Sequence, residues 1–178
     1  MKYYGAIEAG GTKFVCSIIA DPEHYFEEER FPTTTPEETI ARTIAFFEEK
    51  QQKYPLEALG ISCFGPIDLN ESSPTYGYIT STPKPGWMNT NIVGALKDAF
   101  GLKIGFDTDV NGAALAEYIW GNPTNVKSLV YYTIGTGVGA GVVIDGEPVH
   151  GLVHPEAGHV LIRQDIDRDP YAGHCPFH

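Results

Sequence analysis

Two short glycine-rich turns, each flanked by apolar runs, are candidates for binding phosphate groups. In the first, Glu8-Ala9-Gly10-Gly11-Thr12-Lys13, a carboxylate precedes a turn that carries a hydroxyl and an ammonium group. Paired glycines let backbone N–H groups approach phosphate oxygens, and the carboxylate can hold Mg²⁺ directly or through water. The second, Gly135-Thr136-Gly137-Val138-Gly139-Ala140-Gly141, is a glycine run that also lies between two apolar runs. An ordinary glycine hairpin is the alternative for each turn alone, but two such turns in one chain indicate two loops that hold one nucleotide from opposite sides.

A third candidate is the segment Asp107-Thr108-Asp109-Val110-Asn111, where a strand is expected to end and a helix to begin. A carboxylate at such a junction faces the crevice at the carboxyl end of an open α/β sheet, where ligands bind, and it can accept a proton from a hydroxyl group. The alternative is that an aspartate caps the helix. Because two aspartates are present, one can cap the helix while the other acts as a base.

Histidines gather near the end of the chain together with a glutamate and a cysteine. The residues are His150, His154, Glu156, His159, His174, Cys175 and His178. Cys175 and His178 have the C-x-x-H spacing that can present a thiolate and an imidazole to one tetrahedral zinc ion, and His159 is the expected third ligand. The fourth ligand stays open. The alternatives to zinc are terminal disorder or a histidine-rich remnant of expression.

The elements that must position these residues follow an α/β order. Apolar runs at 3–9 and 14–20 predict a hairpin around the first glycine turn, and the acidic segment 21–30 is expected to be a solvated turn that leads into a short strand. Thr35 as an N-cap, with Glu38 three residues later, predicts the start of a helix.

The remaining pattern completes one unit and begins another. We expect a strand at 59–64, a long ordered loop at 65–89, a helix at 91–100, a strand at 103–106, an alanine-rich helix at 110–120, and strands at 128–134 and 140–144. The prediction is an α/β fold with an N-terminal lobe at 1–120. Residues 121–178 are then the beginning of a C-terminal lobe with a partial zinc motif.

Composition narrows the classes of partner. The chain has 178 residues and a net charge of −11, and this acidic balance disfavours nucleic acid, whose binding depends mainly on Lys and Arg. No apolar run approaches the length of a membrane span, which needs about 20 residues. Three cysteines are too few for a disulfide framework, so we expect reduced thiols and a soluble, cytoplasmic protein.

Taken together, these residues resemble the ROK family of sugar kinases in the actin-like ATPase superfamily, and within it the bacterial fructokinases. The resemblance covers the whole chain, with the motifs in the family's order. They are Glu8 to Lys13, Gly65-Pro66-Ile67-Asp68, Thr82 to Trp87, Asp109-Val110-Asn111, residues 135–141 and Glu156-Ala157-Gly158-His159. The resemblance implies an RNase H-like fold, present here as one complete lobe and the start of a second, and transfer of a phosphoryl group from ATP with Mg²⁺ to a hexose.

The same resemblance implies roles for individual residues. Asp109 resembles the family's general base. The implied ATP-binding residues are Gly10, Gly11, Thr12, Lys13, Gly135, Thr136 and Gly137. The implied sugar-binding residues are Thr108, Asp109, Glu156 and His159, and the implied zinc ligands are His159, Cys175 and His178. A zinc ion held by His159 would brace the sugar pocket through a shared residue.

Two departures from the family pattern resemble fructokinases: Glu8 stands where Asp is usual, and Thr108 stands where Asn is usual before the catalytic Asp. We therefore expect phosphorylation of fructose to fructose 6-phosphate. The alternatives are another hexose or N-acetylhexosamine kinase of the family, or a non-catalytic fragment that responds to sugar or binds zinc. The resemblance also implies a homodimer and a chain that is truncated inside the zinc motif.

Overall fold

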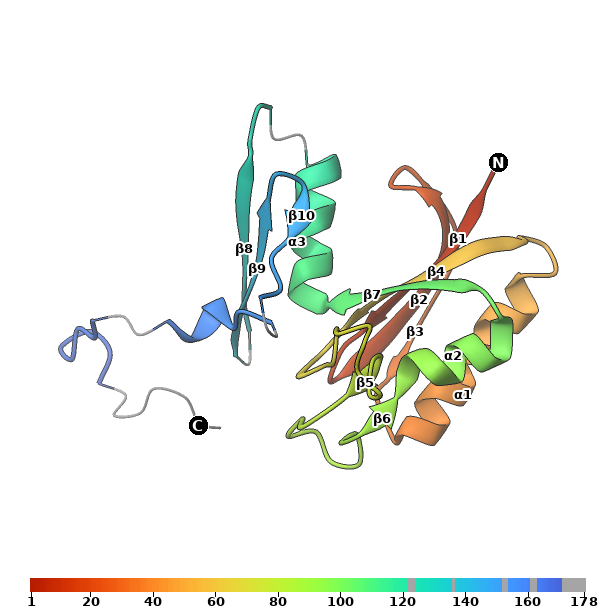
Figure 1. Cartoon of the computed structure of the whole chain (residues 1–178), viewed down its shortest axis with the longest axis horizontal. Helices are drawn as coiled ribbons and strands as arrows, with labels where there is room; N and C mark the ends of the chain where they lie inside the picture. Colours follow the sequence, from red (N-terminus) through yellow and green to blue (C-terminus); the bar gives the residue numbers. More distant parts are fainter. Residues whose placement is uncertain (122–123, 136, 152–153, 161–162, 171–178) are drawn as a thin grey trace.

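The computed structural model describes residues 1–121, 124–135, 137–151, 154–160 and 163–170 (Figure 1). Its larger sheet has five strands in the order β3-β2-β1-β4-β7. They are β1 (Tyr3–Ala9), β2 (Lys13–Asp21), β3 (His24–Pro32), β4 (Leu56–Cys63) and β7 (Lys103–Thr108). β2 lies antiparallel to β1 and β3, whereas β4 lies parallel to β1 and β7. The carboxyl ends of β1, β4 and β7 therefore meet at one edge of the sheet.

Two helices, α1 (Pro36–Lys50) and α2 (Ile92–Phe100), cover one face of this sheet (Figure 1). α1 begins where the sequence predicts, because the Thr35 hydroxyl accepts a hydrogen bond from the Glu38 N–H at 3.3 Å. The buried core between helices and sheet is apolar and aromatic. Its fully buried members include Phe14, Ile18, Phe47, Leu59, Ile92 and Leu96.

The proline-rich segment between β4 and α2 is ordered and packs onto the core. It contains two short strands, β5 (Tyr78–Ile79) and β6 (Thr90–Asn91), which pair antiparallel. Trp87 is completely buried against the rings of Phe14 and Phe64, and its indole N–H donates to the Thr34 carbonyl oxygen at 2.8 Å. The prediction of a long ordered loop is confirmed, and Trp87 anchors it.

Strand β3 differs from the prediction of an acidic turn followed by a short strand. It runs over nine residues as the edge strand of the sheet and pairs with β2 along its length. Phe26 packs edge-on against Tyr3, and Phe31 stacks on Phe14, so the apolar residues hold the strand in place. Charged side chains are typical of edge strands, where they oppose pairing with another chain, and this explains an acidic composition that looked like a turn.

A second sheet follows helix α3 (Asp109–Trp120) and has the order β10-β9-β8. Its strands are β8 (Ser128–Ile134), β9 (Val138–Ile144) and β10 (Glu147–Pro148), and a short 3-10 helix, η1 (Ala157–His159), comes after them. α3 lies against β8 and β9 (Figure 1). The mixed α/β fold expected from the sequence is confirmed.

No helix within the described ranges combines the length and apolar character that crossing a bilayer requires.

Candidate active site

The junction between β7 and α3 places two carboxylates at the carboxyl edge of the larger sheet, and α3 begins between the two sheets (Figure 1). The N-cap of α3 is Thr108, whose hydroxyl accepts from the Asn111 N–H at 3.2 Å. The interpretation of an aspartate as the cap is therefore wrong, because a buried threonine fills that position. Asp107 and Asp109 are both left for other interactions.

Asp109 is accessible to solvent, and one of its carboxylate oxygens accepts from the Val110 N–H at 2.9 Å. The pKa of its carboxyl is raised, mainly because surrounding protein atoms reduce its solvation, and the charge of Glu8 adds to the rise while that of His154 opposes it. A carboxylate with a raised pKa accepts a proton more readily. The surroundings of Asp109 therefore suit a general base.

Close packing behind Asp109 fixes the first turn of α3. Gly112 sits so near Ser62 on β4 that a Cβ at Gly112 would collide with the Ser62 hydroxyl. The thiol of Cys63 is buried, and burial together with the charge of Asp109 raises the pKa of that thiol. The end of β4 thus places a buried thiol within the electrostatic influence of Asp109 and a hydroxyl against the first turn of α3.

The first glycine turn, between β1 and β2, is braced from one side and open on the other. The Gly10 N–H donates to the Lys13 carbonyl at 3.0 Å, and the Thr33 hydroxyl donates to the Gly10 carbonyl at 2.6 Å. A Cβ at Gly11 would meet nothing within 4 Å, and Thr12 and Lys13 are exposed. A ligand can therefore approach the backbone of Gly11 and the ammonium of Lys13.

The second glycine turn, between β8 and β9, contains glycines that are open to solvent and glycines that pack against α3. Gly135 donates its N–H to the Gly137 carbonyl at 2.9 Å, and neither glycine has a neighbour that a Cβ would meet. Thr136 lies outside the described residues. Gly139 and Gly141 face α3 instead, where a Cβ at Gly141 would collide with the Val110 carbonyl. Of the described glycines in this run, Gly135 and Gly137 are open to a ligand.

Glu156 and His159, the predicted sugar-binding pair, are brought together by η1. The Glu156 carboxylate lies 3.4 Å from His159 Nδ1, and its other oxygen lies 3.6 Å from His154 Nδ1. Gly158 packs so closely on β9 that a Cβ would collide with the Val138 carbonyl. The pair is therefore held beside the start of β9, just after the second glycine turn.

The zinc site stays a prediction. Cys175 and His178 fall outside the described residues, and among those the structure does describe, no three His, Cys, Asp or Glu side chains gather around a common point.

Four residues in segments that the sequence singled out have contacts there that it did not predict: Asp107, Asn111, His150 and His154. Asp107 accepts from the Thr108 N–H at 2.7 Å and from Asn111 Nδ2 at 2.9 Å, and its second oxygen lies 2.8 Å from His150 Nε2. Two buried side-chain atoms lack a hydrogen-bond partner within the described ranges: Asn111 Oδ1 and His154 Nε2. The histidine-rich tail was the signal in the sequence for His150 and His154, but it was interpreted as a source of metal ligands.

A cavity of about 650 Å³ lies at the opposite end of the larger sheet, near the amino ends of β1, β4 and β7. Lys2, Tyr4, Glu57 and Lys103 are among the residues that line it, and none of the predicted site residues does. Its position separates it from Asp109, which follows the carboxyl end of β7.

The fold matches part of a sugar kinase of known structure. The structure of the ROK hexokinase from Thermus thermophilus superimposes on 90% of this chain and 54% of its own chain, with a TM-score of 0.75 and 27% sequence identity. The ROK family profile matches residues 4–178, and the chain belongs to the ROK family.

Two curated fructokinases are similar to almost the whole chain. The chain is 51% identical to the fructokinase of Zymomonas mobilis and 51% identical to that of Streptococcus mutans, in each case over 99% of this chain and 60% of the relative. The chain thus spans about 60% of the length of these relatives.

Proposed function

We propose that this chain functions as a fructokinase, which transfers the γ-phosphoryl group of ATP to fructose and yields fructose 6-phosphate. The observation that carries the proposal is 51% identity to two fructokinases over 99% of the chain. The basic carboxylate of Asp109 at the carboxyl edge of the sheet supports it, because phosphoryl transfer needs a group that accepts the hydroxyl proton.

The proposed roles follow the local geometry. Asp109 accepts the proton of the attacking hydroxyl, while Glu156 and His159 hold other hydroxyls of the sugar. The open turns at Gly10 to Lys13 and Gly135 to Gly137 bind the phosphates of ATP through backbone N–H groups and the Lys13 ammonium. Thr108 was expected to touch the sugar, and its hydroxyl bond to Asn111 supports an additional role in shaping the site.

Mg²⁺ and Zn²⁺ belong to the proposal as well. Glu8 fits a magnesium ligand, because its exposed carboxylate lies near the carboxyl end of β1 and its charge acts on Asp109. Magnesium would neutralise charge on the transferring phosphates. His159 fits a zinc ligand in chemistry and exposure, with Cys175 and His178 as its proposed partners.

Zinc is tested by metal analysis of the purified protein. We expect Cys175→Ser to lower the zinc content and the melting temperature more than it changes ATP binding. Cys16→Ser is the control, since burial raises the pKa of the Cys16 thiol to about 12 and keeps it from ligating metal. A parent protein that contains no zinc would exclude the site.

A cytoplasmic location and a homodimer complete the proposal. The free, buried thiols of Cys16 and Cys63 favour a reducing compartment. Sedimentation velocity tests the dimer.

The activity is tested by sugar-dependent release of ADP from Mg-ATP. Fructose, glucose, mannose and N-acetylmannosamine are compared, with this chain and with the product of the whole reading frame that contains it. We expect turnover with fructose. Preference for another sugar would assign a different hexose kinase of the family, and no sugar-dependent release from either protein would overturn the kinase proposal.

A further inference from the structure

A hydrogen bond between Asp107 and His150 joins the larger sheet to the segment that follows the second sheet. His150 Nε2 lies 2.8 Å from Asp107 Oδ2, and the two residues are 43 positions apart in the chain. Asp107 belongs to β7, whereas His150 follows β10. The bond therefore connects two parts of the molecule that α3 also links.

The other oxygen of Asp107 holds the beginning of α3. Asp107 Oδ1 accepts from Asn111 Nδ2 and from the Thr108 N–H, and the Asn111 N–H donates to the Thr108 hydroxyl. Asn111 is completely buried, and its Oδ1 has no partner within the described ranges, so the bond to Asp107 is what orients this amide. Asp109 lies between these bonded residues, and its backbone is fixed from both sides.

The position of His150 matters for the sugar-binding pair. Glu156 and His159 follow it on the same segment, and η1 is seated on β9 through Gly158. A bond that ties His150 to Asp107 thus fixes one end of this segment relative to Asp109.

We propose that His150 and Asp107 form a positioning pair that sets Asp109 against the sugar-binding segment. The inference rests on the proposed function for its kinetic consequences, but the bond itself is independent of it. His150 Nε2 donates a hydrogen bond to Asp107, which also accepts hydrogen bonds from the Thr108 N–H and from Asn111. Together these bonds keep Asp109 in position for proton transfer. Misplacing a reacting group by about 1 Å can cost about 10²-fold in rate.

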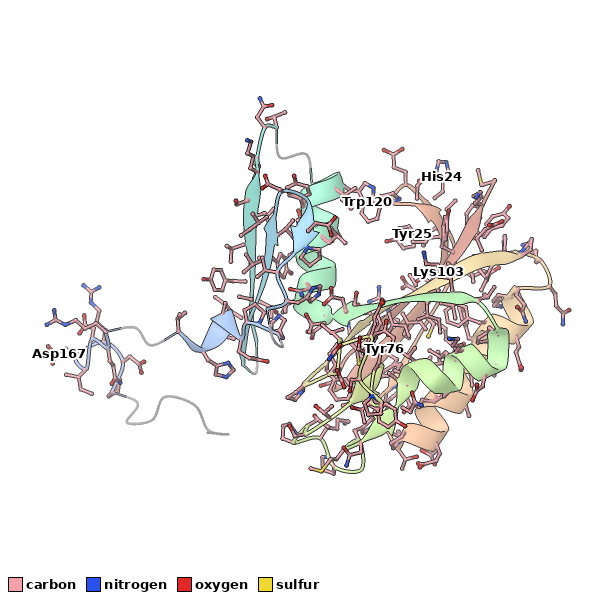
Figure 2. The ribbon with its side chains drawn as sticks, in the orientation of Figure 1. His24, Tyr25, Tyr76, Lys103, Trp120 and Asp167 are labelled. Carbon is pink, nitrogen blue, oxygen red and sulfur yellow. The ribbon has the colours of Figure 1, made fainter. Side chains whose placement is uncertain are left out.

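If the bond between His150 and Asp107 only stabilised the fold, its loss would lower the melting temperature and leave kcat/KM nearly unchanged. The side chains of His150 and Asp107 are 40% and 22% exposed, and partly exposed pairs of this kind contribute little to stability. The chain offers a matched control in His24 and Asp21, which form a 2.7 Å contact with exposures of 52% and 50% at the β2–β3 hairpin, away from the start of α3 (Figure 2).

The kinetic test compares His150→Leu, His150→Gln and His24→Leu in the product of the whole reading frame. We expect His150→Leu to lower kcat/KM for the sugar by about 10- to 100-fold, with KM for ATP and the melting temperature nearly unchanged. His150→Gln should recover most of the loss, because its amide can donate to Asp107. His24→Leu should match the parent. Equal loss in the Leu and Gln variants, or no loss in either, would overturn the proposal.

A second measurement does not depend on activity. Amide hydrogen exchange at Thr108 and Asn111 is followed in this chain, and we expect faster exchange in His150→Leu than in His150→Gln or His24→Leu. Unchanged exchange in His150→Leu would overturn the positioning pair. If the parent shows no sugar-dependent turnover while exchange responds as expected, the proposed function fails and the pair remains.

Discussion

At the scale of single residues, Asp109 combines access to solvent with a carboxyl of raised pKa. The sequence predicts Asp109 as the base, because a carboxylate after a strand and before a helix lies where α/β folds bind ligands, and the structure has this residue at the start of α3 as expected. The sequence was not enough to predict the neighbours that tune Asp109. Glu8 and His154 act on Asp109 from distant parts of the chain, and His150 reaches Asp107 across 43 positions, so no local spacing rule connects them.

Asp109→Asn should remove the proposed base and retain the size of the side chain. We expect kcat to fall by about 10²- to 10⁴-fold, because general base catalysis contributes on that order, while circular dichroism and sugar affinity stay near those of the parent. Asp98→Asn, at an exposed position on α2, is the matched control and should keep full activity. A kcat in Asp109→Asn equal to that of the parent would contradict the assignment.

The pH dependence of turnover should report the raised pKa of Asp109. The proposed base acts when ionised, so kcat/KM falls as the pH drops through a pKa that lies above the usual aspartate value of about 3.9. His154 lowers the pKa of Asp109 through its electrostatic interaction with the carboxylate, so His154→Gln should move this acidic limb to higher pH. A limb that stays in place or moves to lower pH would show that His154 does not act on the base.

At the scale of elements, the glycine run between β8 and β9 contains open glycines and glycines packed against α3, and its composition does not distinguish the two groups. Gly135 and Gly137 are open to solvent, whereas Gly139 and Gly141 let β9 approach α3. Spacing alone predicted one phosphate loop, because the contact with α3 is a tertiary feature.

The helix start at Thr35 was predictable from local chemistry, and the edge strand β3 was not, since its pairing with β2 overrides an acidic composition.

Gly141→Ala and Gly137→Ala should separate the two groups of glycines. A Cβ at Gly141 collides with a backbone carbonyl of α3, so we expect the free energy of unfolding to fall by about 1–3 kcal/mol, as in other overpacked cores. A Cβ at Gly137 meets nothing, and Gly137→Ala should leave the stability unchanged. Chemical denaturation measures both variants. Equal stability of the two would mean that β9 and α3 do not pack as closely as described.

At the scale of the whole molecule, the order of strands and helices predicted the α/β class but not which surfaces stay uncovered. α3 covers one face of the second sheet, and the other face presents apolar side chains. We call it the outer face, and its exposed residues are Val130, Tyr132, Ile134, Val138 and Ile144. Apolar residues on both faces are typical of a buried strand, so the sequence could not separate the covered face from the exposed one.

The outer face should make this chain self-associate when it is studied by itself. Contiguous exposed apolar surface is typical of interaction sites and aggregation-prone surfaces, and β8 is in addition the edge strand of its sheet. We expect concentration-dependent sedimentation of these 178 residues, and we expect Tyr132→Lys combined with Ile134→Lys to suppress it without a change in circular dichroism. Tyr25→Lys is the control, because Tyr25 is 62% exposed on the other sheet. If Tyr25→Lys suppresses association as well, net charge and not the outer face controls it. Suppression by the outer-face variant alone would place the contact on β8, whose apolar side chains then need a covering segment or a second copy in the functional protein.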